Sequence, residues 1–498
     1  MIARRSLLFA GAAAAFAQSP RPVVTGVQTG DPLTDRILLW ARADRPSRLL
    51  VDYNGRSVRA PFALDVSDYT ARLDLTGLPP GSEVRYTVRF ESLGDASLSE
   101  PVEGRARTAP AAKADIRFVW TGDTAGQGYG INPEWGGMRI YETMRRDQPH
   151  FLLHSGDTIY ADNPIPPEIK LPDGSVWKNL TTPEKSKVAE TLDEFRGNYR
   201  YNLLDENIRR FNREVPQIWQ WDDHEVSNNW SPSLDLAANP RYKDKRLGLL
   251  IANATRAFLE YAPIRFDPAD EQRVYRHIPY GPLLDVFVID MRSYRGPNTH
   301  NRQSAESNET VYLDKPQLDW LEQGLARSKA TWKVIASDMP IGLVVGDGKD
   351  KEGRPRFENS ANGDGPPLGR ELEIARVLRA IRQRRIRNVV WLTADTHYTA
   401  AHYYDPAKAQ FKDFDPFWEF VSGPANAGTF GPNATDNTFG IDVQFFKAPP
   451  QGQVNLPPSA GYQFYGLVEI DGRSEQMKVT LKDVAGASLY SKILSPQR

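Results

Sequence analysis

The sequence contains no cysteine among its 498 residues. Disulfides, thiolate nucleophiles, iron–sulfur clusters and cysteine-ligated zinc are therefore excluded, so any metal must be held by oxygen or by imidazole nitrogen. Histidine is also scarce, with 7 residues. The formal net charge is -1. No basic excess points to nucleic acid or to an anionic membrane surface, and we expect no nucleic-acid-binding scaffold.

No hydrophobic run reaches the length that a transmembrane helix requires, and the apolar stretch near the N-terminus is too short to span a bilayer. Arg4-Arg5-Ser-Leu-Leu8 opens that stretch and resembles a twin-arginine export signal, although an ordinary secretory signal is the alternative. Ala15-Phe-Ala17 offers small residues to a signal peptidase. We therefore expect residues 1–17 to engage the twin-arginine export machinery, and the mature protein to be periplasmic or secreted.

Residues 20–109 contain short alternating segments separated by turn residues, which predicts an N-terminal all-β domain of immunoglobulin or fibronectin III shape. The segments expected to be strands are Ile37–Trp40, Leu49–Tyr53, Thr70–Leu75 and Arg85–Phe90. The stretch from Gly104 to Asp115 has the composition of a linker. From residue 115 to 498, strands alternate with helical patterns, which predicts a layered α/β catalytic domain. The final segment, Phe464–Leu494, returns to alternating strands and is expected to complete a second sheet.

Acidic residues follow apolar runs repeatedly in this second region. The five segments are Thr121-Gly-Asp-Thr124, Ser155-Gly-Asp-Thr-Ile-Tyr160, Trp221-Asp-Asp-His-Glu225, Ile289-Asp-Met-Arg292 and Thr393-Ala-Asp-Thr-His397. Open α/β sheets place ligands at the carboxyl ends of their strands, where these acids fall. A single aspartate there can be a helix cap. Five such segments in series indicate a metal cluster, and hence hydrolytic or redox chemistry.

The order of these segments resembles the metallophosphoesterase superfamily. Tyr160 matches a tyrosine that purple acid phosphatases use as a ferric ligand. The segment Trp221-Asp-Asp-His-Glu-Val-Ser-Asn-Asn-Trp230 is similar to the mark of PhoD-type alkaline phosphatases, as is Asp290-Met-Arg-Ser-Tyr-Arg295. The resemblance covers nearly the whole chain. It implies a metallophosphoesterase-type layered α/β sandwich behind the β domain, and hydrolysis of phosphate mono- or diesters.

Two departures from the family pattern affect the metals. Asp123 stands where some members have cysteine, and the superfamily's lone histidine has no evident counterpart, Ser337 or Asp338 being the candidates in that segment. Aspartate in place of asparagine and histidine makes the cluster richer in oxygen, which favours Ca²⁺ or Mn²⁺ over Zn²⁺. Tyr160 as phenolate suits Fe³⁺. The resemblance implies the same combination of iron with calcium.

These considerations assign a role to each candidate residue. Asp157 is expected to bridge two metals; Asp123, Tyr160 and His397 would complete one metal, and Asp223 and Asp395 would serve the other. His224 is the candidate proton donor to the leaving oxygen, or else a residue that orients another. Arg292 and Arg295 could fork onto the phosphate. Asn228 and Asn229 are candidates for contact with metal or substrate, and His402 for lining the site.

Three functions remain open at this point. The first is an exported metal-dependent alkaline phosphatase that acts on small phosphate esters through metal-activated water. The second is a phospholipase D-like or teichoic-acid phosphodiesterase with the same metal core. The third is a surface-binding protein whose degenerate metal site only stabilises the fold.

Overall fold

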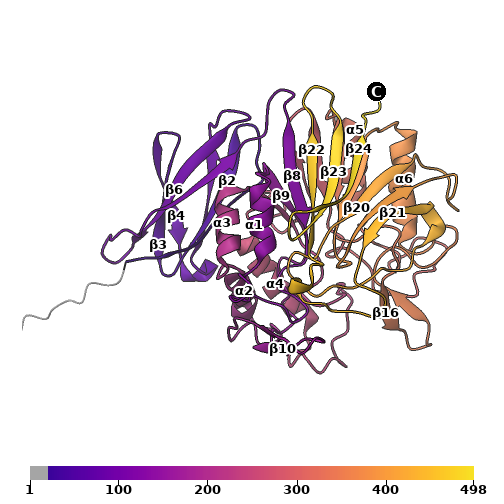
Figure 1. Ribbon diagram of the computed structural model, residues 1–498, viewed down its shortest axis with the longest axis horizontal. Coiled ribbons are helices and arrows are strands. Elements are labelled where there is room, and N and C mark those ends of the chain that lie inside the picture. Colours follow the sequence, from indigo (N-terminus) through magenta and orange to yellow (C-terminus); the bar gives the residue numbers. More distant parts are fainter. Residues whose placement is uncertain (1–20) are drawn as a thin grey trace, which may run out of the picture.

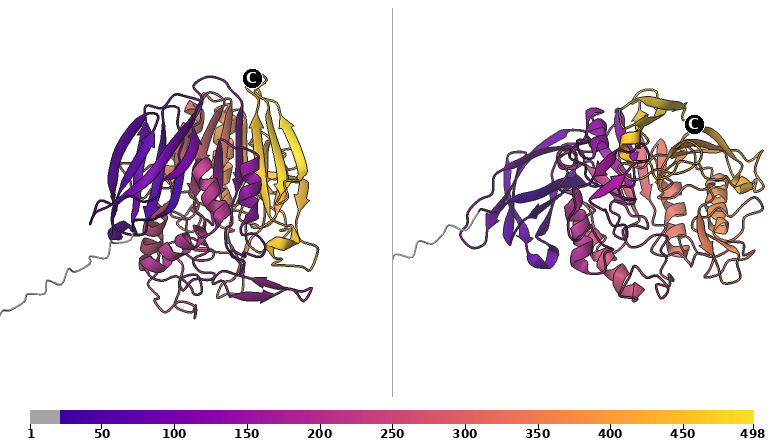
Figure 2. Two further views of the ribbon diagram at one scale, coloured as in Figure 1. Left: turned by 60° about the vertical axis from the view of Figure 1, so that its left-hand side comes forward. Right: turned by 60° about the horizontal axis from the view of Figure 1, so that its bottom comes forward.

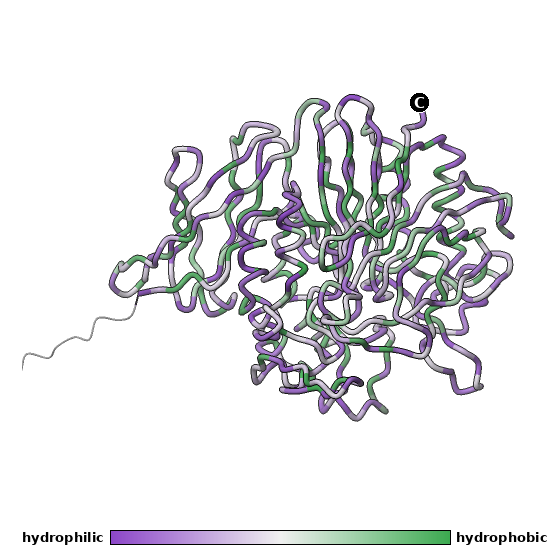
Figure 3. The backbone as a smooth tube through the Cα atoms, in the orientation of Figure 1, coloured by the Kyte–Doolittle hydropathy of each residue, from purple (hydrophilic) through white to green (hydrophobic). Residues whose placement is uncertain are grey.

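The structure is a computed structural model that describes residues 21–498. The expected export signal lies outside the described residues. Two β-rich parts lie side by side, with the N-terminal strands at one end and the C-terminal strands at the other (Figures 1 and 2). The strands are the most hydrophobic stretches of the backbone, and the peripheral loops are mostly hydrophilic (Figure 3).

The N-terminal part is a sandwich of two antiparallel sheets. Its strands are β1 (Val24–Gly30), β2 (Arg36–Ala43), β3 (Ser47–Tyr53), β4 (Arg56–Ala63), β5 (Thr70–Thr76), β6 (Glu83–Ser92) and β7 (Val102–Arg107), with a 3₁₀ turn at Asp65–Ser67. Strands β1, β2 and β5 make one layer, and β4, β3, β6 and β7 make the other. Inward side chains such as Leu39, Val51 and Val88 fill the space between the layers. The expected all-β domain is present.

The α/β part contains two sheets packed face to face, the first of which continues into the layer formed by β1, β2 and β5. The first is built from β8 (Ile116–Thr121), β9 (Phe151–Ser155), β12 (Gln217–Gln220), β22 (Phe464–Ile470), β23 (Met477–Asp483) and β24 (Ser488–Leu494). The second is built from β13 (Arg276–Pro279), β14 (Leu284–Val288), β15 (Trp332–Ala336), β18 (Val389–Thr393), β19 (Thr399–Tyr404), β20 (Phe417–Val421) and β21 (Ile441–Lys447). Trp120, Phe151 and Val334 belong to the core between these sheets.

Helices cover the outer faces of both sheets. They are α1 (Arg139–Arg146), α2 (Leu192–Asn202), α3 (Glu206–Glu214), α4 (Leu247–Tyr261), α5 (Lys315–Arg327) and α6 (Glu371–Gln383). Ile140 of α1 and Phe211 of α3 pack with Leu152 of the first sheet. Leu321 of α5 and Leu378 of α6 pack behind the second sheet. The result is the layered α/β sandwich that the sequence predicts. Among residues 21–498, none of the helices combines the length and the apolar character that crossing a membrane requires.

The two parts share a sheet. Strand β1 runs parallel to β12, with Gly30 opposite Gln217, so β1, β2 and β5 extend the first sheet of the α/β part. A side chain at Gly30 would meet the Pro263 carbonyl oxygen at 2.0 Å, so this close approach requires glycine. Buried Asp31 follows and pairs with Arg276 at 2.7 Å. Although the composition of Gly104 to Asp115 predicts a linker, β7 extends to Arg107 and the N-terminal sandwich is continuous with the first sheet of the α/β part.

Two segments differ from their expected structure. The C-terminal strands β22–β24 do not belong to the second sheet, because β22 pairs antiparallel with β8 and so extends the first. The segment between Gly423 and Pro458, whose polar and glycine-rich composition predicts a long loop, contains a 3₁₀ turn (Asn437–Phe439) and strand β21, which pairs with β19. Strand β21 lies at the sheet edge and is short, and the glycine- and proline-rich residues on both sides of it give the whole segment the composition of a loop. A second 3₁₀ turn (Pro458–Ala460) follows. Two small hairpins, β10 (Glu168–Lys170) with β11 (Val176–Lys178) and β16 (Gly346–Lys349) with β17 (Pro355–Phe357), project from the loops.

Candidate metal centre

The loops that follow β8, β9, β12 and β18 meet at the carboxyl ends of the two sheets. They deliver Asp123, Asp157, Asp223 and Asp395, which the sequence predicts to lie together. Backbone hydrogen bonds join these loops: the Thr124 N–H donates to the Asp157 carbonyl at 2.8 Å. The convergence therefore follows from the parallel strands, whose ends reach the same edge of the molecule.

Left-handed backbone conformations mark the ligand positions. The φ angles are 65° at Asp123, 50° at Asp157, 65° at Asp395 and 59° at His397. Residues with a side chain adopt this region at a cost, and such strain gathers at functional sites where the surrounding structure holds it. The turns after the strands therefore aim each side chain inward at the expense of local backbone energy.

The first group combines Asp123, Asp157 and His397, with ligand atoms within 4.8 Å of one another. The Tyr160 hydroxyl lies 2.7 Å from His397 Nε2, which in turn lies 3.6 Å from Asp123 Oδ1. His397 Nδ1 is held by the Gly428 carbonyl, so Nδ1 carries the proton and Nε2 presents its lone pair. Burial lowers the pKa of His397 to about 4, which keeps the imidazole neutral. All four expected ligands of one metal therefore meet.

The second group combines Asp157, Asp223 and His224, again within 4.8 Å. His224 stacks on the ring of Tyr160 with centroids 4.2 Å apart. Its Nδ1 lies 2.6 Å from Asp162 Oδ1, and Nε2 lies 3.9 Å from Asp223 Oδ1. Burial alone would lower the pKa of His224, but the negative charges of Asp223, Asp162 and Asp157 outweigh burial and raise it. The ring is thus fixed at Nδ1 and turns Nε2 toward the centre.

The third group combines Asp222, Asp223 and Asp395, so Asp223 belongs to two groups as Asp157 does. Asp222 was not among the residues expected from the sequence, although it lies inside the Trp221–Trp230 segment. Its carboxylate is held by the guanidinium of Arg292. The three groups form one continuous cluster in which aspartates supply most of the ligand atoms.

The cluster fits bound cations. Several buried carboxylate oxygens have no hydrogen-bond partner within the described chain: Asp123 Oδ1 and Oδ2, Asp157 Oδ2, Asp222 Oδ2 and Asp223 Oδ1. Burial raises the pKa of Asp123 and Asp157, and neighbouring carboxylates raise it further against the opposing charge of His224. Crowded carboxylates with free lone pairs are costly unless a cation neutralises them. The donor set is the one that hard cations prefer.

Arg292 lies beneath the cluster and is not exposed to solvent. Its Nε contacts Asp222 Oδ1 at 2.6 Å, and its Nη1 contacts Glu358 Oε1 at 2.6 Å. Asp338, a candidate replacement for the missing histidine, lies 3.2 Å from Nε. The guanidinium is therefore engaged by carboxylates of the protein, which differs from the expected fork onto a phosphate. Its geometry is that of a residue that positions ligands.

The other expected contacts lie at different distances from the cluster. The Asn228 side chain is exposed, and its backbone N–H donates to Asp162 Oδ2 at 3.0 Å. The Asn229 N–H donates to Asp223, and its amide donates to Asp347 at 2.9 Å. Arg295 is buried over the ring of Tyr312, 5.4 Å from its centroid, where Nη2 donates to the Glu358 carbonyl. The asparagines thus border the cluster, whereas Arg295 packs behind it.

Two expected candidates have structural roles. Asp290 accepts hydrogen bonds from the Ser293 N–H at 2.9 Å and hydroxyl at 2.6 Å, so it caps the turn after β14. It belongs to none of the three groups. His402 lies on β19, where Nδ1 contacts the buried Glu419 carboxylate at 2.9 Å, so it does not line the cluster. Asp290 therefore caps a turn and His402 is a buried, paired histidine, which are the structural roles that a single acid or histidine commonly has.

Sequence reasoning missed the residues that support the ligands. Asp162, two residues after Tyr160, orients His224 through its Oδ1. Its Oδ2 lies 3.4 Å from Nη2 of Arg241, whose side chain is more exposed. Glu225 accepts from the Thr158 N–H and hydroxyl, each at 2.6 Å, and from the Asp222 N–H at 2.9 Å. Glu225 thereby joins two ligand loops. Both acids lie next to expected ligands, and that proximity is the signal that could have identified them.

Comparison with known proteins agrees with this geometry. The family described as PhoD-like phosphatase matches residues 118–481, and the family described as PhoD-like phosphatase, N-terminal domain, matches residues 10–110. The chain is 26% identical over 468 residues to alkaline phosphatase D of Bacillus subtilis (strain 168), covering 86% of this chain and 74% of that protein. A solved structure titled "Structure of PhoD" shares the fold with a TM-score of 0.67 and 22% identity, covering 95% of this chain and 88% of that one.

Because Asp157 and Asp223 each belong to two ligand groups, we predict that substitutions in the cluster lower the metal content unequally. We expect Asp157→Asn to lower the bound metal more than Asp395→Asn, because Asp157 belongs to two ligand groups and Asp395 to one. Elemental analysis of protein purified in its native folded form measures this. The surface substitution Asp235→Asn should leave the metal content unchanged. Equal losses in the Asp157 and Asp395 variants would contradict a shared ligand.

Proposed function

Because the chain belongs to the PhoD-like phosphatase family and is therefore a phosphate ester hydrolase, we propose that it acts on small phosphate mono- or diesters through water activated by the metal centre. The observation that carries this proposal is the continuous cluster in which Asp157 and Asp223 are each shared by two ligand groups. Cations bound there would lower the pKa of water and offset charge on the phosphoryl oxygens. The protein's own residues position the ester and move the proton.

His224 is the proposed proton donor to the leaving oxygen. Asp162 holds its Nδ1 at 2.6 Å, so Nε2 is the nitrogen that can face an ester. The Tyr160 ring beneath His224 fixes the plane of the imidazole. Asn228, exposed next to Asp162, is proposed to contact the substrate. Arg292 is proposed to hold Asp222 and Asp395 in place, since its guanidinium is already occupied by carboxylates.

The donor chemistry supports iron and calcium. The first group offers a phenol, an imidazole and carboxylates, the set that suits Fe³⁺; they belong to Tyr160, His397, Asp123 and Asp157. Asp222, Asp223 and Asp395 offer only oxygen, which suits Ca²⁺. Mn²⁺ or Zn²⁺ are the alternatives. The N-terminal Arg4-Arg5 pattern supports the proposal that the twin-arginine machinery exports the enzyme, which would act in the periplasm or outside the cell.

Turnover of chromogenic phosphate esters tests the metal-activated mechanism. We expect metal-replete protein to hydrolyse a mono- or diester, chelation to abolish turnover, and Asp157→Asn to lower kcat/KM by about 1,000-fold or more, the scale of several kcal/mol of charge stabilisation. Asp173→Asn on the exposed β10–β11 turn is the matched control. The proposal fails if metal-replete protein hydrolyses neither ester and Asp157→Asn has no effect.

Iron at the first group predicts a visible absorption band from charge transfer between tyrosinate and Fe³⁺. Tyr160→Phe should abolish the band, because it removes the phenol oxygen that lies 2.7 Å from His397 Nε2. Tyr404→Phe should keep the band, because Tyr404 is an equally buried tyrosine that donates instead to Glu419 at 2.8 Å. A colourless wild type with full iron content would contradict phenolate ligation.

Proton donation by His224 predicts a dependence on the leaving group. Asp162→Asn should lower kcat by about 10- to 100-fold while metal content is unchanged, because the imidazole loses its charged partner. The loss should be largest for alkyl phosphates, whose poor leaving groups need protonation, and smallest for nitrophenyl phosphate. A merely structural role for Asp162 would lower the turnover of both classes equally.

A further inference from the structure

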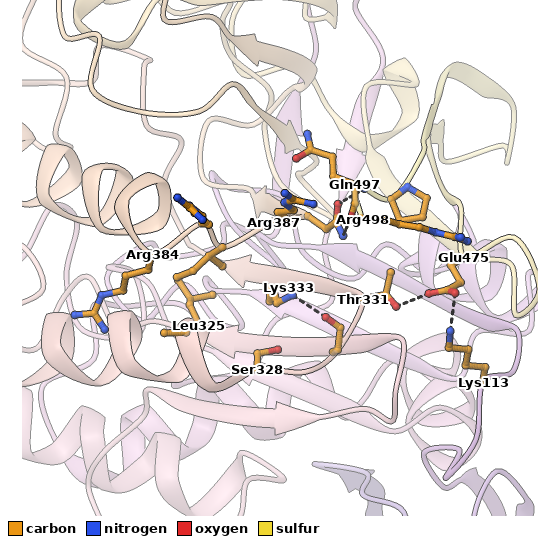
Figure 4. Close-up of a pocket in the computed structure, with 16 residues that line it drawn as sticks. Lys113, Leu325, Ser328, Thr331, Lys333, Arg384, Arg387, Glu475, Gln497 and Arg498 are labelled. Carbon is orange, nitrogen blue, oxygen red and sulfur yellow. Dashed lines mark hydrogen bonds and ion pairs between the residues drawn. The ribbon is translucent and has the colours of Figure 1, made fainter.

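A pocket lies at the amino ends of the central strands β15 and β18 of the second sheet, whereas the metal centre lies at their carboxyl ends. Figure 4 shows the residues that line this pocket. Its volume is about 640 Å³. The C-terminal ends of α5 and α6, the start of β15, the residues just before β18, the turn between β22 and β23 and residues 496–498 surround it. Asp338 and Asp395 follow the other ends of β15 and β18, so these five-residue strands separate the two sites by about 17 Å.

Basic side chains dominate the lining of this pocket: Lys113, Lys333, Arg384, Arg385, Arg387 and Arg498. Glu475 is the one acid among the lining residues, and it already pairs with Lys113 Nζ at 2.6 Å and accepts from the Thr331 hydroxyl at 2.6 Å. Figure 4 shows Arg387 and Lys333 in the middle of the pocket, Arg498 extending toward Glu475, and Arg384 set to one side. In a chain of net charge -1, this is a concentrated positive site.

Two of the arginines have unused guanidinium groups. Within residues 21–498, no hydrogen bond or ion pair involves the side chains of Arg385 or Arg387, and both side chains are exposed. Arg379 and Arg382 of α6, which do not line the pocket, pair in contrast with Asp413 at 3.0 and 3.5 Å. The acids of the surface therefore neutralise the helix arginines outside the pocket more fully than those at its mouth.

Arg385 occupies a position that the backbone would assign to glycine. It follows the C-cap residue of α6 with φ 55°, and the Ile386 N–H donates to the Ile381 carbonyl at 2.9 Å, which closes a Schellman motif. The left-handed position itself favours glycine, and a basic side chain at this end is compatible with the helix dipole. The Arg385 guanidinium is exposed and remains available to an anion.

The uncharged residues that line the pocket restrict the class of ligand that it can bind. Its apolar members are Leu325, Ala326, Ala330, Ile386 and Pro496, and no aromatic residue lines the pocket. Nucleic-acid bases need an aromatic platform for stacking, which is missing among these residues. Guanidinium groups match phosphate and sulfate oxygens in geometry and charge. Recognition here is therefore directed at oxyanion groups and not at a base.

We propose that this pocket binds a molecule that carries two or more closely spaced phosphate or sulfate groups. The same oxyanion chemistry is found in soluble polyphosphorylated molecules and in anionic lipid headgroups. The pocket is separate from the metal centre, so this inference does not depend on the proposed hydrolytic mechanism. A molecule bound in this pocket would supply no coordinating atom to the metal cluster.

Inositol hexasulfate is a suitable probe because a phosphatase cannot hydrolyse it. Calorimetric titration should show binding that weakens as ionic strength rises. The double variant Arg385→Gln/Arg387→Gln should bind about ten-fold more weakly or worse, because it loses two charge-assisted contacts. Arg209→Gln/Arg210→Gln, an equally exposed pair on α3, is the matched control and should bind as the wild type does. Both double variants should keep their turnover of a chromogenic ester.

The outcomes separate the sources of the ligand. Hexasulfate binding without retention on phosphatidylglycerol vesicles supports a soluble ligand, whereas vesicle retention that requires Arg385 and Arg387 supports a lipid headgroup. Equal hexasulfate affinity in the wild type and the Arg385/Arg387 variant, or an equal loss in the control pair, would overturn the site. If the protein binds hexasulfate but does not hydrolyse esters, the proposed catalytic mechanism is contradicted, whereas the proposed oxyanion pocket is not.

Discussion

The crowding of buried carboxylates is the constraint on which the rest of the structure depends. Asp123, Asp157, Asp222, Asp223 and Asp395 lie within one cluster, and burial raises the pKa of most of them. Like charges in a medium of low polarity repel strongly, so such a cluster stays folded only if positive charge is supplied. Arg292 and His224 supply part of it from the protein. Bound cations are the natural source of the remainder.

Several other parts of the fold hold the crowded carboxylates in position. Parallel strands bring the ligand loops to one edge, and Glu225 joins the loops after β9 and β12 through the Thr158 and Asp222 N–H groups. Beneath them, Arg292 links Asp222 to Glu358, which comes from the loop after β17. The N-terminal sandwich extends the same sheet through Gly30 and Gln217. Ligands held from several directions keep their positions when the charge in the site changes during catalysis.

Much of the architecture could be predicted because it is local. Apolar runs with acids at their ends indicate parallel strands and their carboxyl edge, and β8, β9, β14 and β18 lie where those runs predict them. The resemblance to purple acid phosphatases implies Tyr160 as a ligand, and its hydroxyl lies 2.7 Å from His397 Nε2. Strand β21 was missed because its seven residues lie inside a long segment rich in glycine, proline and asparagine, which has the composition of a loop. The sheet to which β22 belongs was also missed, since pairing partners distant in sequence leave no local pattern.

The sequence by itself determined the oxygen-rich donor set, the exclusion of thiolate ligands and the order of ligands along the chain, because these properties depend on residue identity and spacing. Only the tertiary structure decided which groups share a ligand, that Arg292 is occupied by carboxylates, and that Asp162 orients His224. It also gathered the arginines after α6 with Lys333 and Lys113 into one pocket. Such contacts join residues tens to hundreds of positions apart, and long-range packing of loops sets their geometry, which no local pattern encodes.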